Sequence, residues 1–373
     1  MGHVRSAKSI SLYNGIFPLH IIYEPFYRSP LLSIPNFFFH RKDKRKRSME
    51  KMASTTKPNV YVLDPYHPDA IFLLKSQSDI KLILPTSPEI KNWRQDATAV
   101  LLRSTTRLAS ADFSNAPHLK LVVKQGVGVD NIDLKSASSH GIAVHNTPAL
   151  NSEAVAELAL ALPLALARRV GEFDRRIRRG EVVKRSEMLG VSLFRKTVGV
   201  VGMGNIGFEV AKKWRGACES KIVVYDPVAK ADAWPDLPHE RVKSLEELLR
   251  VSDVVTLHVP LLDSTRGMIG KKELEMMKEG AILVNCARGG IVDEKALVKA
   301  LKEEIIWGAV LDAVESEPPT LEAYGELLSF DRVILTPHAG AGTADNQSRS
   351  GVAAVETLLA VLRGAKDVSG KLV

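Results

Sequence analysis

Three charged side chains stand just past apolar runs in the second half of the chain. Arg288 follows the run AILVNCA, Glu317 comes soon after IWGAVLDA, and His338 ends the run RVILTPH. Histidine titrates near neutral pH and serves in proton transfer, although most histidines make only local hydrogen bonds. Arg288 and Glu317 would each be explained equally well by a strand-end salt bridge. The occurrence of all three at strand ends indicates a common functional site more specifically than any one of them does alone.

These runs belong to a series of apolar segments that alternate with helix-like segments. Most are rich in Val, Ile and Leu without polar alternation, which is typical of parallel strands covered on both faces. Ligands of such sheets bind outside the carboxyl ends of the strands, so the three charged residues are expected to converge there. The strands are expected at 59–64, 99–103, 119–124, 141–146, 197–202, 221–226, 253–260, 281–287, 306–313 and 332–338.

A long helix is expected between the two groups of strands. It should run from Ser152 to about Arg169, with Ser152 as its N-cap and Pro163 as a kink. Its sequence EAVAELALALPLALA is apolar nearly all round, which predicts burial, with a second subunit as one candidate partner.

A glycine-rich turn follows the strand at 197–202. The sequence VGVVGMGNIG places Gly202, Gly204 and Gly207 as G-x-G-x-x-G between a strand and a helix. Glycines there permit a tight turn, a close approach of the backbone to a pyrophosphate, and close packing of helix and strand. Asp226, about 20 residues further on, can accept hydrogen bonds from ribose hydroxyls and would repel a 2′-phosphate. The turn therefore predicts NAD as cofactor in preference to NADP.

Length, charge and cysteine content narrow the class of protein. A chain of 373 residues is expected to form two domains, and no apolar run approaches the roughly 20 residues that span a bilayer.

The two cysteines, Cys218 and Cys286, lie far apart and lack the spacing of metal ligands. They therefore indicate neither a metal site nor a disulfide framework, and they fit a reducing compartment. The net charge of +8 resides in residues 1–57, which hold eleven Lys or Arg and three acids. We therefore expect no nucleic-acid partner and no membrane contact for the folded body.

Residues 1–57 are expected to be a disordered basic extension without a catalytic role. A targeting segment, a nuclear address in the run RKDKRKR, and an over-read start before Met52 all fit this composition. The protein is expected in the cytoplasm, with mitochondria or the nucleus as alternatives if the extension is a targeting segment.

Several motifs in one order resemble the D-isomer-specific 2-hydroxyacid dehydrogenases. They are GVGVDNID, NTPALNSEAVAE, VGVVGMGNIG, LHVPLLDSTRGMIG, NCARGGIVDE, LDAVESEPP and LTPHAGAGT. The resemblance covers about residues 98–363, and more weakly 58–97. It implies an α/β fold of two Rossmann-like domains with parallel sheets, in which the nucleotide domain is inserted into the substrate domain. The implied parts are a substrate domain at 58–150 and 337–363, an NAD-binding domain at 151–336 and a tail at 364–373.

The resemblance also implies roles for particular residues. His338 would exchange a proton with the substrate oxygen at C2, Glu317 would orient the imidazole and raise its pKa, and Arg288 would grip the substrate carboxylate. The implied cofactor-binding residues are Gly202, Gly204, Asn205, Ile206, Gly207, Asp226, His258, Val259, Pro260, Thr265, Cys286, Ala287, Asp312 and Gly340. The implied substrate-binding residues are Arg103, Ser104, Val127, Gly128, Asn151 and Gln347.

Within that family the chain most resembles the D-3-phosphoglycerate dehydrogenases without a C-terminal regulatory domain. LRSTTRL is similar to their anion-binding segment, but Lys124 stands where an Arg is usual and Val314 where an aromatic residue is common. Hydroxypyruvate, glyoxylate and branched 2-keto acids therefore remain candidate substrates beside 3-phosphoglycerate. An NAD(H)-sensing corepressor or scaffold of the same fold is the alternative function. A homodimer is expected.

Overall fold

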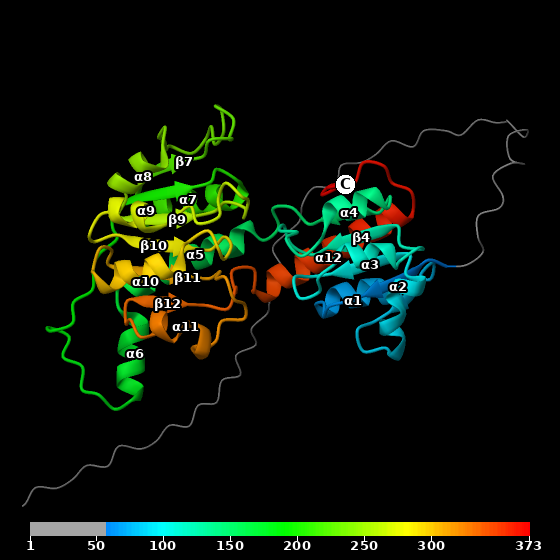
Figure 1. Ribbon diagram of the computed structural model, residues 1–373, viewed down its shortest axis with the longest axis horizontal. Coiled ribbons are helices and arrows are strands. Elements are labelled where there is room, and N and C mark those ends of the chain that lie inside the picture. Colours follow the sequence, from blue (N-terminus) through cyan, green and yellow to red (C-terminus); the bar gives the residue numbers. More distant parts are fainter. Residues whose placement is uncertain (1–56) are drawn as a thin grey trace, which may run out of the picture. The chain divides into compact units, whose positions relative to one another are not determined.

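The computed structural model describes residues 57–373, which contain two parallel sheets with helices on both faces (Figure 1). The expected fold class, α/β with two parallel sheets, is confirmed. The predictions made for the N-terminal extension up to residue 56 lie outside the described residues. Among the helices of residues 57–373, none combines the length and the apolar character needed to cross a bilayer.

The first sheet has five strands in the order β2-β1-β3-β4-β5, all parallel. Their bounds are β1 Asn59–Val62, β2 Lys81–Ile83, β3 Ala99–Leu102, β4 Leu121–Lys124 and β5 Ala143–Asn146. The helices of this part are α1 Pro68–Lys75, the 3₁₀ helix Pro88–Asn92, α2 Trp93–Asp96, α3 Ser110–Ser114, α4 Leu134–Ser139 and α12 Ala344–Leu362.

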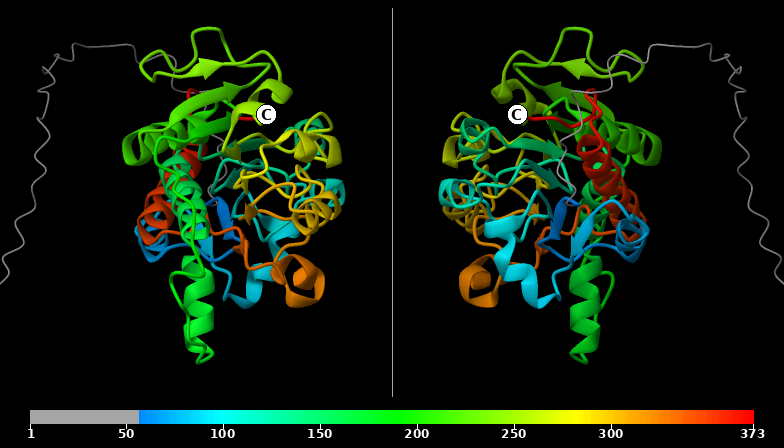
Figure 2. Two further views of the ribbon diagram at one scale, coloured as in Figure 1. Left: turned by 90° about the vertical axis from the view of Figure 1, so that its left-hand side faces the viewer. Right: turned by 90° about the vertical axis from the view of Figure 1, so that its right-hand side faces the viewer.

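Alternate residues of these strands face two separate cores, as the period of a strand requires. Val60 and Val62 pack with residues of α1 and α12, such as Leu74 and Leu358. Tyr61, on the opposite face, packs with residues of α3 and α4. Figure 1 and Figure 2 both show α12 (red) beside α1 (blue), although nearly the whole described chain separates them. The segment after the second sheet thus completes the core of the first.

The second sheet has seven parallel strands in the order β12-β11-β10-β9-β6-β7-β8. Their bounds are β6 Thr197–Val201, β7 Lys221–Tyr225, β8 Glu240–Arg241, β9 Val254–Leu257, β10 Ile282–Asn285, β11 Gly308–Leu311 and β12 Val333–Leu335. The helices of this part are α5 Ser152–Ala167, α6 Val170–Arg178, α7 Asn205–Cys218, α8 Leu245–Val251, α9 Lys271–Met276, α10 Glu294–Lys302 and α11 Leu321–Leu328.

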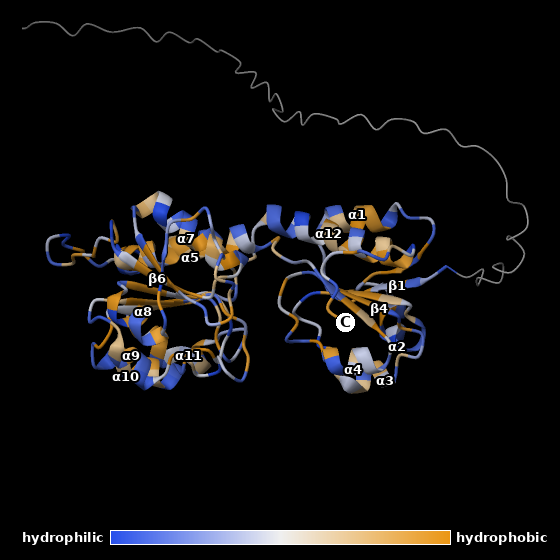
Figure 3. Cartoon of the chain, turned by 90° about the horizontal axis from the view of Figure 1, so that it is seen from above, coloured by the Kyte–Doolittle hydropathy of each residue, from blue (hydrophilic) through white to orange (hydrophobic). Residues whose placement is uncertain are grey.

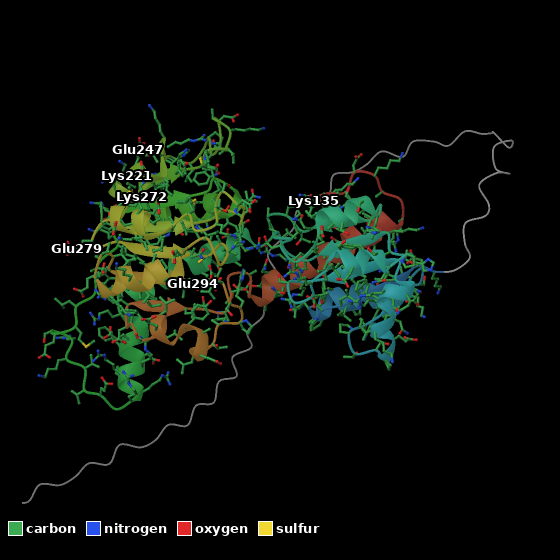
Figure 4. All side chains as sticks on the ribbon, in the orientation of Figure 1. Lys135, Lys221, Glu247, Lys272, Glu279 and Glu294 are labelled. Carbon is green, nitrogen blue, oxygen red and sulfur yellow. The ribbon has the colours of Figure 1, made fainter. Side chains whose placement is uncertain are left out.

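Helices cover both faces of this sheet. Trp214 of α7 is fully buried with residues of α5 on one face, and Leu248 of α8 packs with residues of α9 and α10 on the other. Figure 3 shows the apolar strands enclosed by helices whose outer sides are polar. Charged residues labelled in Figure 4, such as Glu247 on α8 and Lys272 on α9, lie on exposed positions of these helices. Burial on both faces explains why the strands read as unbroken apolar runs.

The expected strands are present, but they are shorter than the apolar runs that predicted them. The run 253–260, for example, contains the strand Val254–Leu257 followed by an irregular segment. The helices α1, α2, α3, α4, α6 and α11, the 3₁₀ helix Pro88–Asn92 and the short strands β2 and β8 were not predicted from the sequence. The predicted domain limits stay predictions.

The predicted N-cap of α5 is wrong by one position. Asn151 is the N-cap, without a side-chain hydrogen bond to the helix, and Ser152 is the first helical residue. The helix ends at Ala167 because Arg169 adopts a left-handed conformation (φ 54°), after which α6 starts. Pro163 lies inside α5 as expected.

Residues at the end of the chain add hydrogen bonds to β5, the edge strand of the first sheet. The Asn146 N–H donates to the Gly370 carbonyl at 2.9 Å, and the Leu372 N–H donates to the Val144 carbonyl at 2.9 Å. A Cβ on Gly370 would lie 2.2 Å from the Asn146 carbonyl oxygen, and its φ is +79°. This contact therefore requires glycine at position 370.

Candidate active site

His338 and Glu317 form a close pair at the carboxyl ends of neighbouring strands of the second sheet. The His338 ring nitrogen Nδ1 lies 3.0 Å from both carboxylate oxygens of Glu317. Their side chains are 39% and 37% exposed, so the pair is reachable from solvent. The two residues that the sequence predicted to meet are therefore in hydrogen-bond contact.

The carboxylate of Glu317 titrates below its usual range. Burial raises its pKa, but the hydrogen bond and charge of His338, the Val314 N–H and the charge of Arg288 together lower it. An ionised carboxylate only accepts hydrogen bonds, so the hydrogen between the pair is assigned to His338 Nδ1. Nε2 of the ring is then the nitrogen free to exchange a proton with a ligand.

The buried carboxylate of Asp312 fixes the turn on which His338 stands. His338 has a left-handed backbone (φ 55°), which is a strained conformation for a residue with a Cβ. Asp312 accepts the Thr336 hydroxyl at 2.6 Å, the Ala339 N–H at 2.7 Å and the Gly340 N–H at 2.9 Å. These three hydrogen bonds enclose His338 from both sides along the chain. Asp312, predicted as a cofactor contact, therefore also shapes the histidine turn.

Arg288 reaches from β10 to the loop after β4. Its Nε donates to Asp130 at 2.8 Å, and one Nη donates to the Ala287 carbonyl at 2.7 Å. A Cβ on Gly128 would lie 1.6 Å from the guanidinium, so only glycine leaves room for it. The second Nη thus lies against the backbone of Gly128, a predicted substrate-binding residue.

Two residues that the sequence did not single out hold Arg288 in place. Asp130 forms the ion pair just described, and Arg288 lowers the pKa of Asp130 against the raising effect of its burial. Asn285, which is 1% exposed, donates to the carbonyls of Arg288 and Ala313. The signal for Asn285 was available, since it is a polar residue that ends a fully apolar strand.

The backbone loop Gly126–Gly128 is held by β5 and the residue after it. The Gly126 N–H donates to the Thr147 hydroxyl at 2.7 Å, and the Asn146 amide donates to the Val127 carbonyl at 2.7 Å. Val127 is 39% exposed. The loop that carries the predicted substrate-binding N–H groups is therefore held by hydrogen bonds to Asn146 and Thr147, while the Val127 side chain is exposed to solvent.

Lys124 is a buried ammonium at the foot of the same loop. It is 3% exposed, and its Nζ lies 3.3 Å from the Ser104 hydroxyl. Burial and the charge of Arg288 lower its pKa to about 8, against the opposing charges of Asp130 and Asp64. An ammonium without a hydrogen-bonded carboxylate is suited to a bound anion.

The other predicted substrate residues are less directly connected. The Arg103 guanidinium donates to the Pro65 carbonyl, and Gln347 bonds to Gln125 and to the Ala341 carbonyl. The buried side-chain oxygen of Asn151 has no partner within residues 57–373. None of the described hydrogen bonds joins Arg103 or Asn151 to the Arg288, Glu317 and His338 group.

The glycine turn after β6 has the shape that a dinucleotide requires. A Cβ on Gly202 (φ +101°) would lie 2.5 Å from the His258 carbonyl, whereas a Cβ on Gly204 would meet nothing within 4 Å. No side chain caps the first N–H groups of α7. Asp226 accepts the Met203 N–H at 2.8 Å, which joins it to the turn. Free N–H groups at a helix start beside an open glycine and a carboxylate fit NAD.

The remaining predicted cofactor residues lie at strand ends of this sheet with varied environments. Burial lowers the pKa of His258 to about 3, and its Nε2 lies 2.8 Å from the Thr256 hydroxyl. Burial raises the pKa of the Cys286 thiol, with a smaller contribution from Asp312. The Thr265 hydroxyl donates to the Pro260 carbonyl at 2.6 Å. Within residues 57–373, no cluster of His, Cys, Asp or Glu is arranged to hold a metal ion.

Comparison with known proteins agrees with this geometry. Residues 160–340 match the family model described as D-isomer specific 2-hydroxyacid dehydrogenase, NAD binding domain. The chain is 40% identical over 306 residues to D-3-phosphoglycerate dehydrogenase of Methanocaldococcus jannaschii, covering 82% of this chain and 57% of that protein. It is 39% identical to hydroxypyruvate reductase of Thermotoga maritima, covering 80% and 96%.

A solved structure supports the same conclusion. The crystal structure of D-lactate dehydrogenase from Aquifex aeolicus complexed with NAD and lactic acid has a TM-score of 0.72 and 31% identity, covering 82% of this chain and 96% of that chain. Two parallel sheets, a glycine turn and a His–Glu pair beside an arginine define an NAD-dependent oxidoreductase. The chain belongs to the D-isomer-specific 2-hydroxyacid dehydrogenase family.

The close approach of Arg288 to Gly128 gives a direct test of the site. In Gly128→Ala, the added methyl group would overlap the guanidinium, so Arg288 must move. We expect kcat/KM for 2-keto acids to fall by about tenfold or more, since the arginine loses its place beside the loop. Steady-state kinetics with NADH measures this.

Gly216→Ala is the matched control, because a Cβ there would meet nothing within 4 Å. It should leave kcat/KM unchanged. Equal kinetics for the Gly128 variant and the control would contradict the assigned position of Arg288.

Proposed function

We propose that this protein interconverts a small 2-keto acid and the D-2-hydroxy acid with NAD(H). The observation that carries the proposal is the hydrogen-bonded pair of His338 and Glu317, 3.0 Å apart, with Arg288 in the same charged group. A group that can give and take a proton and a fixed guanidinium are what a 2-hydroxy acid needs at its oxygen and its carboxylate.

In the proposed reaction, His338 exchanges a proton at Nε2 with the oxygen on C2 of the substrate. Glu317 accepts the hydrogen bond from Nδ1 and thereby fixes the orientation of the ring. Arg288 binds the substrate carboxylate together with the N–H groups of the loop at Val127 and Gly128. Bound NAD supplies the acceptor or donor of the hydride, and Gly202, Gly204 and Asp226 would hold it.

The choice of acid is the finer part of the proposal. Lys124 beside Ser104 supplies a second positive charge, which suits a substrate with a second anionic group, such as phosphohydroxypyruvate. The similarity to a D-3-phosphoglycerate dehydrogenase supports this choice. The similarity to a hydroxypyruvate reductase, of which the chain covers 96%, keeps the smaller acids as candidates.

We expect His338→Ala to lower kcat by several orders of magnitude without loss of NADH binding, because the proton donor is removed while the glycine turn is untouched. The assay follows NADH oxidation with phosphohydroxypyruvate, hydroxypyruvate, glyoxylate and 2-ketoisocaproate. Binding is measured separately by NADH fluorescence.

An unchanged kcat in His338→Ala would remove this residue from the chemistry. Binding of NADH by the wild type without turnover of any acid would contradict the proposed reaction and favour the corepressor or scaffold alternative.

The lowered pKa of Lys124 predicts a pH dependence that depends on the substrate. Above about pH 8 the ammonium loses its proton, so kcat/KM for phosphohydroxypyruvate should fall by up to roughly tenfold per pH unit. The decline should be shallower for glyoxylate, which has no second anionic group. In Lys124→Arg the guanidinium stays charged, so the difference between the two substrates should disappear. Identical profiles for both acids in the wild type would exclude Lys124 from substrate selection.

We further propose a homodimer in which the segment from α6 to β6 contacts a second copy. This segment exposes large apolar side chains, which are Val170, Ile177, Val182, Leu189 and Phe194, exposed by 54%, 64%, 92%, 74% and 51%. Sedimentation should show a dimer for the wild type and a monomer for the double variant Ile177→Asp, Leu189→Asp. Phe72→Asp changes an equally exposed residue elsewhere and should stay dimeric. A dimeric double variant would exclude this surface.

We also propose a cytoplasmic location, because the thiols of Cys218 and Cys286 are both free and buried. The test is the location of a fluorescent fusion to the full chain in cells. A mitochondrial or nuclear signal would contradict the proposed location.

A further inference from the structure

A pocket of about 550 Å³ lies at the start of α7. Residues of four separate segments line it, among them Ser152, Gly204, Asn205, Trp234 and Arg349. Gly204 and Asn205 belong to the glycine turn, Ser152 begins α5, and Arg349 stands on α12. The pocket therefore joins the proposed phosphate-binding turn to the helix that packs on the first sheet.

The glycine turn itself carries no positive charge. Met203, Asn205 and Ile206 are the side chains between its glycines, and all three are neutral. The N–H groups at the start of α7 attract an anion, but a pyrophosphate brings two negative charges to this point. A cation from elsewhere in the pocket would complete the site.

Arg349 is the one cation among the lining residues. Within residues 57–373 it makes no described hydrogen bond or ion pair, and it is exposed. The two acids of the pocket already have lysine partners, since Lys213 lies 2.6 Å from Glu153 and Lys212 lies 3.4 Å from Glu209. The guanidinium is therefore available to a ligand.

A second feature of the pocket indicates that a ligand belongs there. The Ser152 hydroxyl is buried and has no hydrogen-bond partner among the described residues, and the residue is 5% exposed. Buried hydroxyl groups are nearly always paired, so this one lacks a partner that a bound group or water supplies.

We propose that Arg349 binds the pyrophosphate of NAD from the side opposite the glycine turn. The planar guanidinium can hold two phosphate oxygens at once, while the start of α7 holds the others. This inference rests on the proposed use of NAD and adds a binding residue contributed by α12. Cofactor binding would thereby depend on a residue from the helix that completes the first sheet's core.

The test compares NADH binding by the full-length wild type, Arg349→Ala and Arg349→Lys, measured by fluorescence titration, with ADP-ribose as a second ligand. We expect Arg349→Ala to raise both Kd values by about ten- to a hundredfold, and Arg349→Lys to have a smaller effect. The dependence of log Kd on log salt should become weaker in Arg349→Ala, because one charge contact is lost. At saturating NADH, kcat should be retained.

Arg215→Ala is the matched control, since it removes an exposed arginine from α7 itself, outside the pocket. It should leave Kd and its salt dependence unchanged. Equal Kd values for wild type and Arg349→Ala would overturn the inference while leaving the proposed function intact. A loss of kcat at saturation would also overturn it, since Arg349 would then act on the chemistry. Absence of NADH binding by the wild type would instead defeat the proposed function.

Discussion

The carboxylate of Asp312 is the constraint on which the candidate site depends. It lies 1% exposed at the end of β11 and accepts three hydrogen bonds from the turn that carries His338. Three donors satisfy a charge that would otherwise be costly to bury. The same bonds hold the left-handed backbone at position 338 and so aim the ring at Glu317. One buried acid thereby fixes the turn that places His338 in hydrogen-bond contact with Glu317.

Close packing of the backbone at two glycines places Arg288 near the pair of His338 and Glu317. Gly289 packs against the loop after β11, where a Cβ would lie 2.0 Å from the Val314 carbonyl oxygen, so the segments that carry Arg288 and Glu317 touch. Gly128 admits the guanidinium from the opposite direction. Asp130 then accepts a hydrogen bond from the guanidinium, and the Asn285 side chain donates to the backbone carbonyl of Arg288. The position of the Arg288 side chain is thus determined both by the space at Gly128 and by its polar contacts.

The sequence was sufficient for the parallel strands and for the residues at their ends. Apolar runs without polar alternation indicate strands that are buried on both faces, and glycines in the pattern G-x-G-x-x-G indicate a phosphate-binding turn. The helices α1, α3 and α4 were not predicted, because helices of five to eight residues are too short to show a clear period. Asp130 could not be found in this way, since its ion pair with Arg288 joins residues 158 positions apart. Arg349 could not be found either, since the other residues that line its pocket come from distant segments of the chain. Ser152 was predicted as the cap, but it is the first residue of the helix and one of the residues that line a pocket, which the sequence does not reveal.

Gly370 lies far from Arg288 along the chain, yet two hydrogen bonds connect it to the loop Gly126–Gly128. It accepts a hydrogen bond from the Asn146 backbone, and the Asn146 side chain donates to the Val127 carbonyl. Any side chain at position 370 would push on Asn146 and, through it, on the loop. A variant found there in a genetic screen would act on the loop at Val127 from a distance, through Asn146.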